Sequence, residues 1–280
     1  MSTKEPKLTI LINNWTLRNQ TDADGKPLGV PGQIEKVKDA GFDAFTCPAD
    51  AEGLKQALSQ FGLRYAAAFD AGSVEEAEKK IKAGLSIDNG PMNCQLGDHD
   101  TPVDRAIEMT IGLMEVAEKL GADVHLEMHR DTCTETPEKT YAIVEGVTKA
   151  RGKPPKINFD FSHPGSLKHL SAANYIDRLY EDVPLFQQST LWHMRPFNGH
   201  HCQVPVTDGR GHFTPEYEEM RPFIRQGLLY WLEGDRPTNE FWVCPELGPK
   251  YGYGLSCFPD SWQDAIVLGN DIRKIWNELV

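Results

Sequence analysis

The sequence of 280 residues lacks the signatures of several common protein classes. Its six cysteines form no Cys-x-x-Cys pair, which leaves little support for a thiolate zinc site or a redox dithiol. Scattered cysteines in a chain of this length are typical of a reducing compartment. No apolar run approaches the ~20 residues that a membrane-spanning helix needs. The first residues also lack the apolar stretch and cleavage site of a signal peptide. We therefore expect a cytoplasmic protein without a membrane partner.

Runs of positive charge are also missing. The chain has 29 Lys and Arg against 41 Asp and Glu, for a net charge of −12, whereas nucleic-acid binders usually carry a basic face. Neither the G-x-G-x-x-G nor the G-x-x-x-x-G-K-[ST] motif is present, so the usual nucleotide-binding signatures are absent. We expect no nucleic-acid partner and an unphosphorylated substrate.

A regular alternation of short and long segments is what the sequence does contain. Hydrophobic residues make up 40% of the chain and charged residues 25%, which suits a packed globular core. Short apolar runs predict strands over Leu8–Asn13, Phe42–Cys47, Tyr65–Phe69, Met92–Leu96, Asp123–Glu127, Lys156–Phe161, Leu191–Met194 and Phe241–Pro245. Helical periodicity predicts helices over Pro31–Ala40, Asp50–Phe61, Glu75–Ala83, Pro102–Leu120, Thr136–Thr148, Ala172–Tyr180, Thr214–Trp231 and Trp262–Leu279.

Eight strand–helix units require parallel strands joined by right-handed crossovers. Eight such units in one chain of this length indicate a closed barrel rather than an open sheet. The sequence therefore predicts an α/β fold, a (β/α)₈ TIM barrel with residues 1–280 in a single domain.

Chemistry-bearing side chains end four consecutive predicted strands. Glu127, Asp160, His193 and Glu246 occupy these ends, and the first three are spaced by 33 residues each, one strand–helix unit apart. In a TIM barrel such positions meet at the catalytic mouth. Three converging carboxylates repel each other, and a divalent cation relieves that repulsion. Three oxygen donors and one imidazole suit one Mn²⁺, Mg²⁺ or Co²⁺ ion, with Zn²⁺ as a further candidate.

Each of these residues also has an ordinary structural interpretation. An acidic residue after a strand is often a helix N-cap or a solvated loop charge, and a lone histidine there is often hydrogen-bonded in the core. The coincidence on four successive strands favours the metal site.

The order Glu…Asp-x-x-His…His…Glu resembles the xylose isomerase-like TIM-barrel superfamily, which includes ketose 3-epimerases, inosose dehydratases and hydroxypyruvate isomerases. The residues that carry the resemblance are Glu127, the Asp160-Phe161-Ser162-His163 segment, His193 and Glu246, the last within Pro-Glu-Leu-Gly.

The resemblance implies roles for these residues. Glu127 and Glu246 would bind the metal and exchange a proton with a substrate carbon. The metal would polarise a carbonyl or hydroxyl and stabilise an enediolate. His163, as a catalytic group, and Arg195 would bind substrate oxygens near the developing charge.

Extra imidazoles mark a departure from a plain epimerase. His129 and His99 follow predicted strand ends, and His200 and His201 lie in a long loop after Leu191–Met194. His129, His99 and His201 are candidate substrate contacts, although the two loop histidines are equally compatible with a solvated loop. Trp15 is a candidate wall for a sugar face, as are Phe69 and Trp192, but core packing is the expected role for at least two of these three.

Two enzymatic functions agree with this pattern. The first is a metal-dependent isomerase or epimerase of a carbohydrate. The second is a lyase or hydratase acting on a keto-sugar, keto-glycoside or inosose. An endonuclease IV-like barrel would need a zinc trio and a basic face, and a non-catalytic sugar-binding barrel would be expected to lack Glu127 or Glu246. By analogy with other barrels, we also expect a homo-oligomer, a dimer or a tetramer.

Overall fold

A computed structural model describes residues 5–280 and contains eight strands in one parallel sheet. The strands are β1 Lys7–Asn13, β2 Ala44–Cys47, β3 Arg64–Ala71, β4 Met92–Leu96, β5 Val124–Glu127, β6 Ile157–Asn158, β7 Leu191–Met194 and β8 Glu240–Pro245. Their order in the sheet is β6-β5-β4-β3-β2-β1-β8-β7. The first strand thus pairs with the last, as in a TIM barrel.

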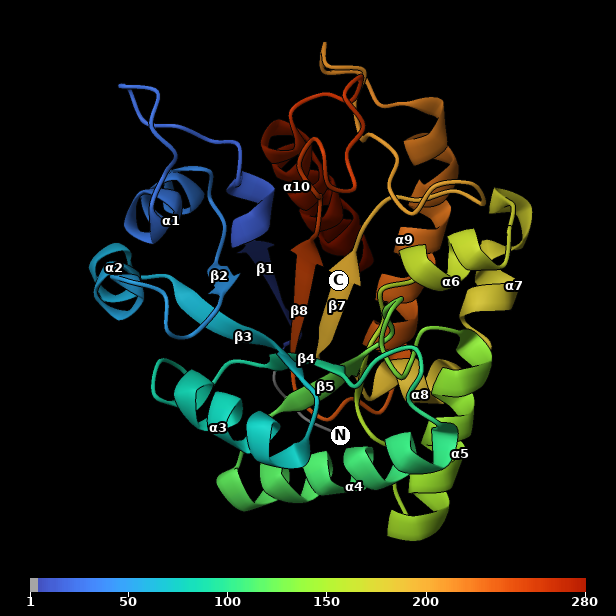
Figure 1. Ribbon diagram of the computed structural model, residues 1–280. Coiled ribbons are helices and arrows are strands. Elements are labelled where there is room, and N and C mark those ends of the chain that lie inside the picture. Colours follow the sequence, from blue (N-terminus) through green and yellow to red (C-terminus); the bar gives the residue numbers. More distant parts are fainter. Residues whose placement is uncertain (1–4) are drawn as a thin grey trace.

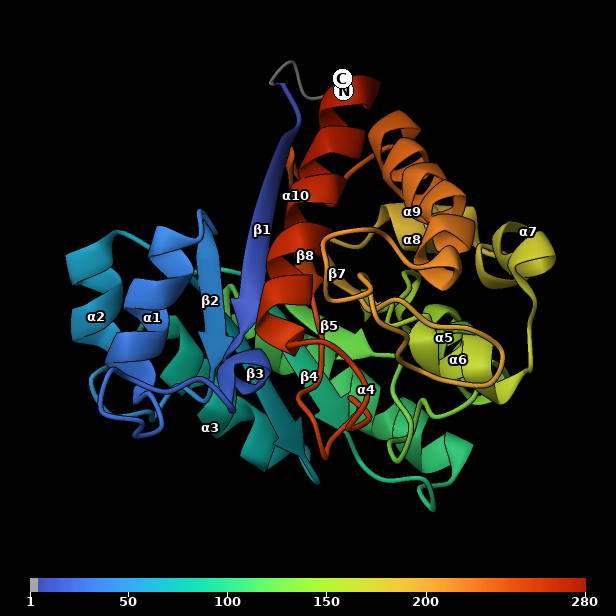
Figure 2. The ribbon, with the colours of Figure 1, turned by 90° about the horizontal axis from the view of Figure 1, so that it is seen from above.

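Helices surround the strands (Figure 1). They are α1 Val30–Asp39, α2 Leu54–Phe61, α3 Val74–Leu85, α4 Val103–Leu120, α5 Pro137–Arg151, α6 Ser162–Leu167, α7 Tyr175–Leu179, α8 Val183–Gln187, α9 Pro215–Glu233 and α10 Ser261–Leu279, with short 3₁₀ turns at Asn14–Leu17 (η1) and Ala172–Asn174 (η2). The closing helix α10 packs on β1 and β8 (Figure 2). Within residues 5–280, no helix has both the length and the apolar character needed to cross a bilayer.

Most elements lie where the sequence predicts them, and β4 coincides with its predicted range. Strand β6 is shorter than predicted, because the chain leaves the sheet after Asn158 and begins α6 at Ser162. The predicted helix over 172–180 is instead the short η2 and α7, followed by a separate α8. The sixth unit is therefore the least regular of the barrel.

Side chains complete the junction between β6 and β7, the two ends of the sheet. Asn158 donates to Asn93 Oδ1 at 2.8 Å, and its own Oδ1 accepts from the backbone N–H of His193 at 2.9 Å. The hydroxyl of Ser189 donates to the carbonyl oxygen of Ile157. Buried polar groups need such partners, so Asn158 links β4, β6 and β7 just below the mouth.

A small buried cluster fills the lower part of the barrel, formed by Leu11, Ala44, Ala66, Leu191, Trp242 and Cys244. Side chains two positions further along a strand point to the same face. On the same strands, these next positions are Asn13, Thr46, Ala68, His193 and Glu246. All of these positions except Ala68 carry polar or charged side chains, so the barrel interior is apolar below and mainly polar at the mouth.

Candidate metal centre and active site

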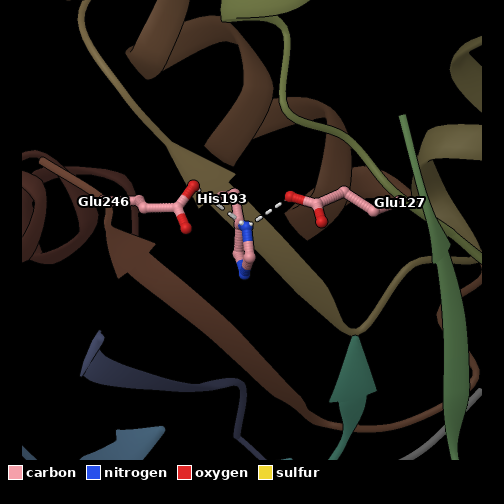
Figure 3. Close-up of side chains that lie close together, drawn as sticks. All are labelled: Glu127, His193 and Glu246. Carbon is pink, nitrogen blue, oxygen red and sulfur yellow. Dashed lines mark hydrogen bonds and ion pairs between the residues drawn. The ribbon is translucent and has the colours of Figure 1, made fainter. Parts of the chain in front are cut away.

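Glu127, His193 and Glu246 converge at the mouth of the barrel (Figure 3). His193 Nδ1 lies 2.8 Å from Glu127 Oε1 and 3.2 Å from Glu246 Oε2. One ligand atom from each residue lies within 4.8 Å of the other two, and all three residues are buried. Two carboxylate oxygens and one imidazole nitrogen form a suitable partial donor set for a divalent cation.

The charges of this cluster are held together by a proton on His193. Burial by itself would lower the pKa of His193, but Glu246 and Glu127 raise that pKa well above its usual value. Burial alone would raise the pKa of Glu127, but the neighbouring His193 lowers that pKa to about 2. His193 is therefore cationic between two anions, and its charge offsets part of the negative charge of the carboxylates.

Asp160 lies beside this trio rather than within it. Arg195 Nη2 is 2.7 Å from Glu246 Oε2 and 3.2 Å from Asp160 Oδ2, and so connects the two carboxylates. Asp160 Oδ1 accepts the Ser162 hydroxyl at 2.5 Å. Its Oδ2 is buried and has no hydrogen-bond partner among the described residues. This oxygen instead lies within ion-pair distance of Arg195 and His163, and Asp160 is outside the group of ligand atoms formed by Glu127, His193 and Glu246.

Three amide side chains hold the two glutamates in place. Asn93 and Gln95 donate to Glu127 Oε2 at 2.6 and 2.9 Å, and Asn13 donates to Glu246 Oε1 at 3.1 Å. These bonds leave Glu127 Oε1 and Glu246 Oε2 directed at His193. None of the three amides was predicted from the sequence, although each is a polar residue on an apolar strand, which is the signal that identifies it.

A cavity of about 560 Å³ opens beside the cluster, on the side of β1 to β4. His193 and Glu246 form its inner edge, next to Asn13, Asn93 and Gln95. Its other lining residues come from the ends of β1, β2 and β3 and from α3: Asn14, Thr46, Cys47, Pro48, Ala49, Asp50, Tyr65, Ala67, Ala68, Phe69, Asp70, Lys79, Lys80 and Ala83. The volume lies within the ~300–1,000 Å³ of small-molecule sites.

Tyr253, from the loop after β8, covers the other side of the mouth. Its ring lies 4.1 Å from the guanidinium carbon of Arg195 and 4.4 Å from that of Arg130. Its hydroxyl is 3.5 Å from His129 Nε2, and its ring centre is 6.1 Å from that of His163. Tyr253 therefore holds Arg195 by a cation–π contact, a contact that the sequence did not reveal.

The predicted substrate residues Arg195, His129 and His163 all lie on the Tyr253 side. His163 is buried, and its Nε2 lies 3.3 Å from Asp160 Oδ2. The ring centres of His163 and His129 are 4.1 Å apart. Burial lowers the pKa of His163 despite the opposing charge of Asp160, so its imidazole is neutral at pH 7.

The remaining candidates are more dispersed. His99 is exposed and lies 2.5 Å from Asp131, and His201 is exposed and bonded to Asn198. Trp15 is half-buried, with its ring centre 5.3 Å from that of Tyr253.

Three other side chains singled out in the sequence differ in their surroundings. Trp192 is fully buried among aromatic rings, in agreement with a core role, whereas Phe69 lines the cavity. His200 is exposed, with its ring centre 4.6 Å from that of His169.

Comparisons by sequence give no relatives: no family model matches the chain, and no curated protein matches it. Solved structures do match. A xylose isomerase-like TIM barrel protein from Mycobacterium smegmatis in complex with magnesium has a TM-score of 0.63 at 16% identity, over 98% of each chain. The probable 3-DHS dehydratase AsbF of Bacillus anthracis gives 0.59 at 14% identity, over 95% of this chain and 98% of that one. A sugar phosphate isomerase/epimerase from Parabacteroides distasonis gives 0.58 at 11% identity, over 96% and 98%.

The comparisons establish the fold. The chain is a single (β/α)₈ barrel of the α/β class, similar in fold to the solved xylose isomerase-like TIM barrel protein. The predicted fold class and the resemblance stated from the sequence are both confirmed.

Proposed function

We propose that this chain is a divalent-metal-dependent sugar isomerase or epimerase that removes a proton next to a carbonyl. The observation that carries the proposal is the buried trio of Glu127, His193 and Glu246 at the edge of a substrate-sized cavity. The three buried carboxylates of Glu127, Glu246 and Asp160 outnumber the two cationic groups of His193 and Arg195 that pair with them, and a divalent cation would supply the missing compensation. The isomerase/epimerase of similar fold supports the same class of reaction.

The metal site would consist of Glu127, His193, Glu246 and Asp160. The first three already present ligand atoms to one another, and Asp160, whose Oδ2 pairs with Arg195 and His163, would have to turn towards the metal to supply the fourth. The magnesium in the Mycobacterium smegmatis protein is consistent with an oxygen-rich site. When bound, the cation would polarise the carbonyl and stabilise negative charge as the proton leaves.

Protein groups would carry the proton and orient the substrate. Glu246 lines the cavity and is the better placed glutamate to take the proton, and Glu127 would serve as its partner. Arg195 and His163 would hold substrate oxygens near the developing charge. Arg195 is fixed for this task by its bonds to Glu246 and by the ring of Tyr253.

Elimination or hydration on a keto-sugar, keto-glycoside or inosose is the second candidate. Its support is the pair of adjacent imidazoles, His163 and His129, which would relay the proton taken from the substrate to a leaving group. The dehydratase of similar fold also favours it. Both candidates begin with the same proton removal and differ in whether a group departs.

Deuterated water separates the two candidates and tests them together. The Mn²⁺-loaded protein is incubated with keto-sugars and followed by NMR and mass spectrometry. Deuterium incorporation without loss of water or aglycone supports the isomerase or epimerase, and such a loss supports the lyase. No exchange with any ketose, keto-sugar or inosose would refute the shared mechanism.

A further inference from the structure

The two glutamates of the trio differ in how many oxygen lone pairs their neighbours already occupy. Each carboxylate oxygen has about two lone pairs that can accept hydrogen bonds. Both lone pairs of Glu127 Oε2 are taken, by Asn93 at 2.6 Å and by Gln95 at 2.9 Å. Its Oε1 is directed at His193 Nδ1, 2.8 Å away (Figure 3). Glu127 is also 0% exposed and does not line the cavity, so it is placed as a ligand and does not face a substrate carbon.

Glu246 keeps a free oxygen position. Its Oε2 is 2.7 Å from Arg195 Nη2 and 3.2 Å from His193 Nδ1. Its Oε1 accepts one hydrogen bond, from Asn13 at 3.1 Å, which leaves the second lone pair of Oε1 unoccupied among residues 5–280. Glu246 also lines the cavity. Oε1 of Glu246 is therefore the oxygen of the trio that a C–H bond in the cavity can approach.

The other charged groups of the cavity lining lie near solvent. Asp50, Asp70 and Lys79 are exposed. Lys80 is bonded to Glu76 at 2.9 Å and to the carbonyl oxygen of Asp70 at 2.8 Å. Within the part of the chain that the structure describes, Glu246 is thus the buried carboxylate of this lining.

Two further ionisable groups line the cavity, and both keep their protons. The hydroxyl of Tyr65 donates to the carbonyl oxygen of Cys47 at 2.7 Å, and the thiol of Cys47 donates to that of Pro48 at 3.4 Å. Burial raises the pKa of Cys47 to about 12 and also raises the pKa of Tyr65. Both are therefore poor proton donors to a substrate carbon.

The number of proton carriers decides the outcome of the reaction. Proton removal next to a carbonyl leaves a flat enediolate with two faces. Inversion of the carbon needs a second group that delivers a proton to the opposite face. One carboxylate returns the proton to the face from which it took it, and on that face it can reach the neighbouring carbon. Such a transfer converts a ketose into an aldose.

We infer that Glu246 alone carries the carbon-bound proton, and that the reaction is the interconversion of a ketose and an aldose rather than an epimerisation. This inference rests on the proposed function and narrows it to one type of substrate pair. Glu127 then serves Glu246 as a fellow metal ligand and not as a second base.

The transfer balances without a further reactant. Glu246 takes a proton from C1 of the ketose, and the electron pair of that C–H bond forms the C1–C2 double bond while the carbonyl pair moves to O2. Glu246 then gives its proton to C2, and the hydroxyl proton of O1 moves to O2 as the aldehyde forms at C1. Arg195 and His163 would contact the two oxygens and not the carbons.

The position of deuterium in the product tests the inference. The Mn²⁺-loaded protein in deuterated water receives D-fructose, D-psicose, D-tagatose, D-sorbose, D-xylulose or D-ribulose, and NMR follows each sugar. For the sugar that reacts, we expect an aldose, deuterium at one of the two C1 hydrogens of the remaining ketose, and none at C3. A ketose inverted at C3 with deuterium on that carbon would overturn the inference and leave the proton chemistry intact. No exchange into any of these sugars would refute the proposed function, and the inference with it.

A label placed on the substrate shows whether one group carries the proton. The reacting ketose, dideuterated at C1, is converted in ordinary water, and the aldose is analysed by NMR and mass spectrometry. Because Glu246 is only 6% exposed, we expect part of the deuterium to return at C2. An aldose without deuterium at C2 would mean that water or another group delivers the proton, and the inference would be wrong.

Matched substitutions identify the carrier. Glu246→Gln, with bound Mn²⁺ confirmed by titration, should lose exchange at C1 by ~100-fold or more, whereas Asp50→Asn and Asp70→Asn should stay within ~3-fold of wild type. The exposed Glu108→Gln is the control. A second carrier on the lining would either preserve exchange in Glu246→Gln or make one aspartate variant fail as severely, and either result would overturn the inference.

Discussion

Glu127 and Glu246 are held by different partners, although both face His193. Glu127 accepts from two neutral amides, whereas Glu246 accepts from one amide and from the guanidinium of Arg195. Glu246 also lines the cavity. The two carboxylates are therefore not equivalent, and a substitution at each should affect different steps.

Glu127→Gln and Glu246→Gln should both fold and lose activity. Loss of a general base typically costs 10²–10⁴-fold in rate, and loss of a charged ligand should also weaken Mn²⁺ binding. Turnover and metal titration measure the two effects, with the exposed Glu108→Gln as control. Wild-type turnover in either variant would disprove the role assigned to that glutamate.

Tyr253 should act through Arg195. A desolvated cation–π contact is worth up to about 2 kcal/mol, which corresponds to roughly 30-fold in binding. Tyr253→Ala should therefore raise KM by about 10-fold or more with a smaller change in kcat, and Tyr253→Phe should stay near wild type. Steady-state kinetics on both variants provide the measurement. An unchanged KM in Tyr253→Ala would mean that Arg195 needs no support from the ring.

At the scale of the elements, β6 is the weakest part of the barrel wall. Asn158 joins this two-residue strand to β4 and β7 through buried hydrogen bonds. Asn158→Ala leaves the side-chain amide oxygen of Asn93 and the backbone N–H of His193 without partners. Each unpaired buried group costs about 1–3 kcal/mol of stability. Urea unfolding should show a loss of about 2–5 kcal/mol, against almost none for the exposed Asn277→Ala. A loss below 1 kcal/mol would show that the junction closes without Asn158.

At the opposite end of the barrel, Glu240 should make stability depend on acid. Despite partial burial, bonds from Lys7, Thr9 and Arg64 lower the pKa of Glu240 to about 2. Because the pKa of Glu240 is lower in the folded protein than in the unfolded chain, ionised Glu240 stabilises the fold above the unfolded pKa of ~4.3. This stabilisation is lost as the pH falls towards 2.

Thermal scans of Glu240→Gln from pH 7 to pH 2 test this dependence. At pH 7 the variant should be less stable by about 1–2 kcal/mol, and its gap to wild type should close between pH ~4.3 and ~2. Glu108→Gln should show no such gap. A gap that is constant over the whole range would mean that the ionisation of Glu240 is not the cause.

The same elements show what sequence periodicity could and could not predict. Met92–Leu96 was located correctly because it is a compact apolar run between turn residues. The end of β6 was misplaced because Phe159 and Phe161 continue the alternating pattern after the ladder stops. Both rings are buried outside the strand, so hydrophobic patterning alone could not locate its end.

For the whole molecule, eight strand–helix units were enough to predict a barrel, and strand ends were enough to predict its mouth. The sequence could not predict that one side of the mouth is covered and the other open. This difference depends on the conformation of the loop after β8, where Tyr251 adopts a left-handed φ of 65° and Tyr253 reaches Arg195. Such long-range packing leaves no local pattern.

Metal binding should be visible in the stability of the entire barrel, because the trio joins β5, β7 and β8. A ligand at 100 times its Kd stabilises the native state by about 2.7 kcal/mol, or roughly 5–10 °C in Tm for a chain of this size. Mn²⁺ should therefore raise Tm, and a chelator should reverse both the rise and the activity. The metal must replace the proton on His193, so the shift should grow with pH. Glu127→Gln should abolish it, whereas a Tm that is insensitive to Mn²⁺, Mg²⁺, Co²⁺ and Zn²⁺ in the wild-type protein would exclude a metal at this site.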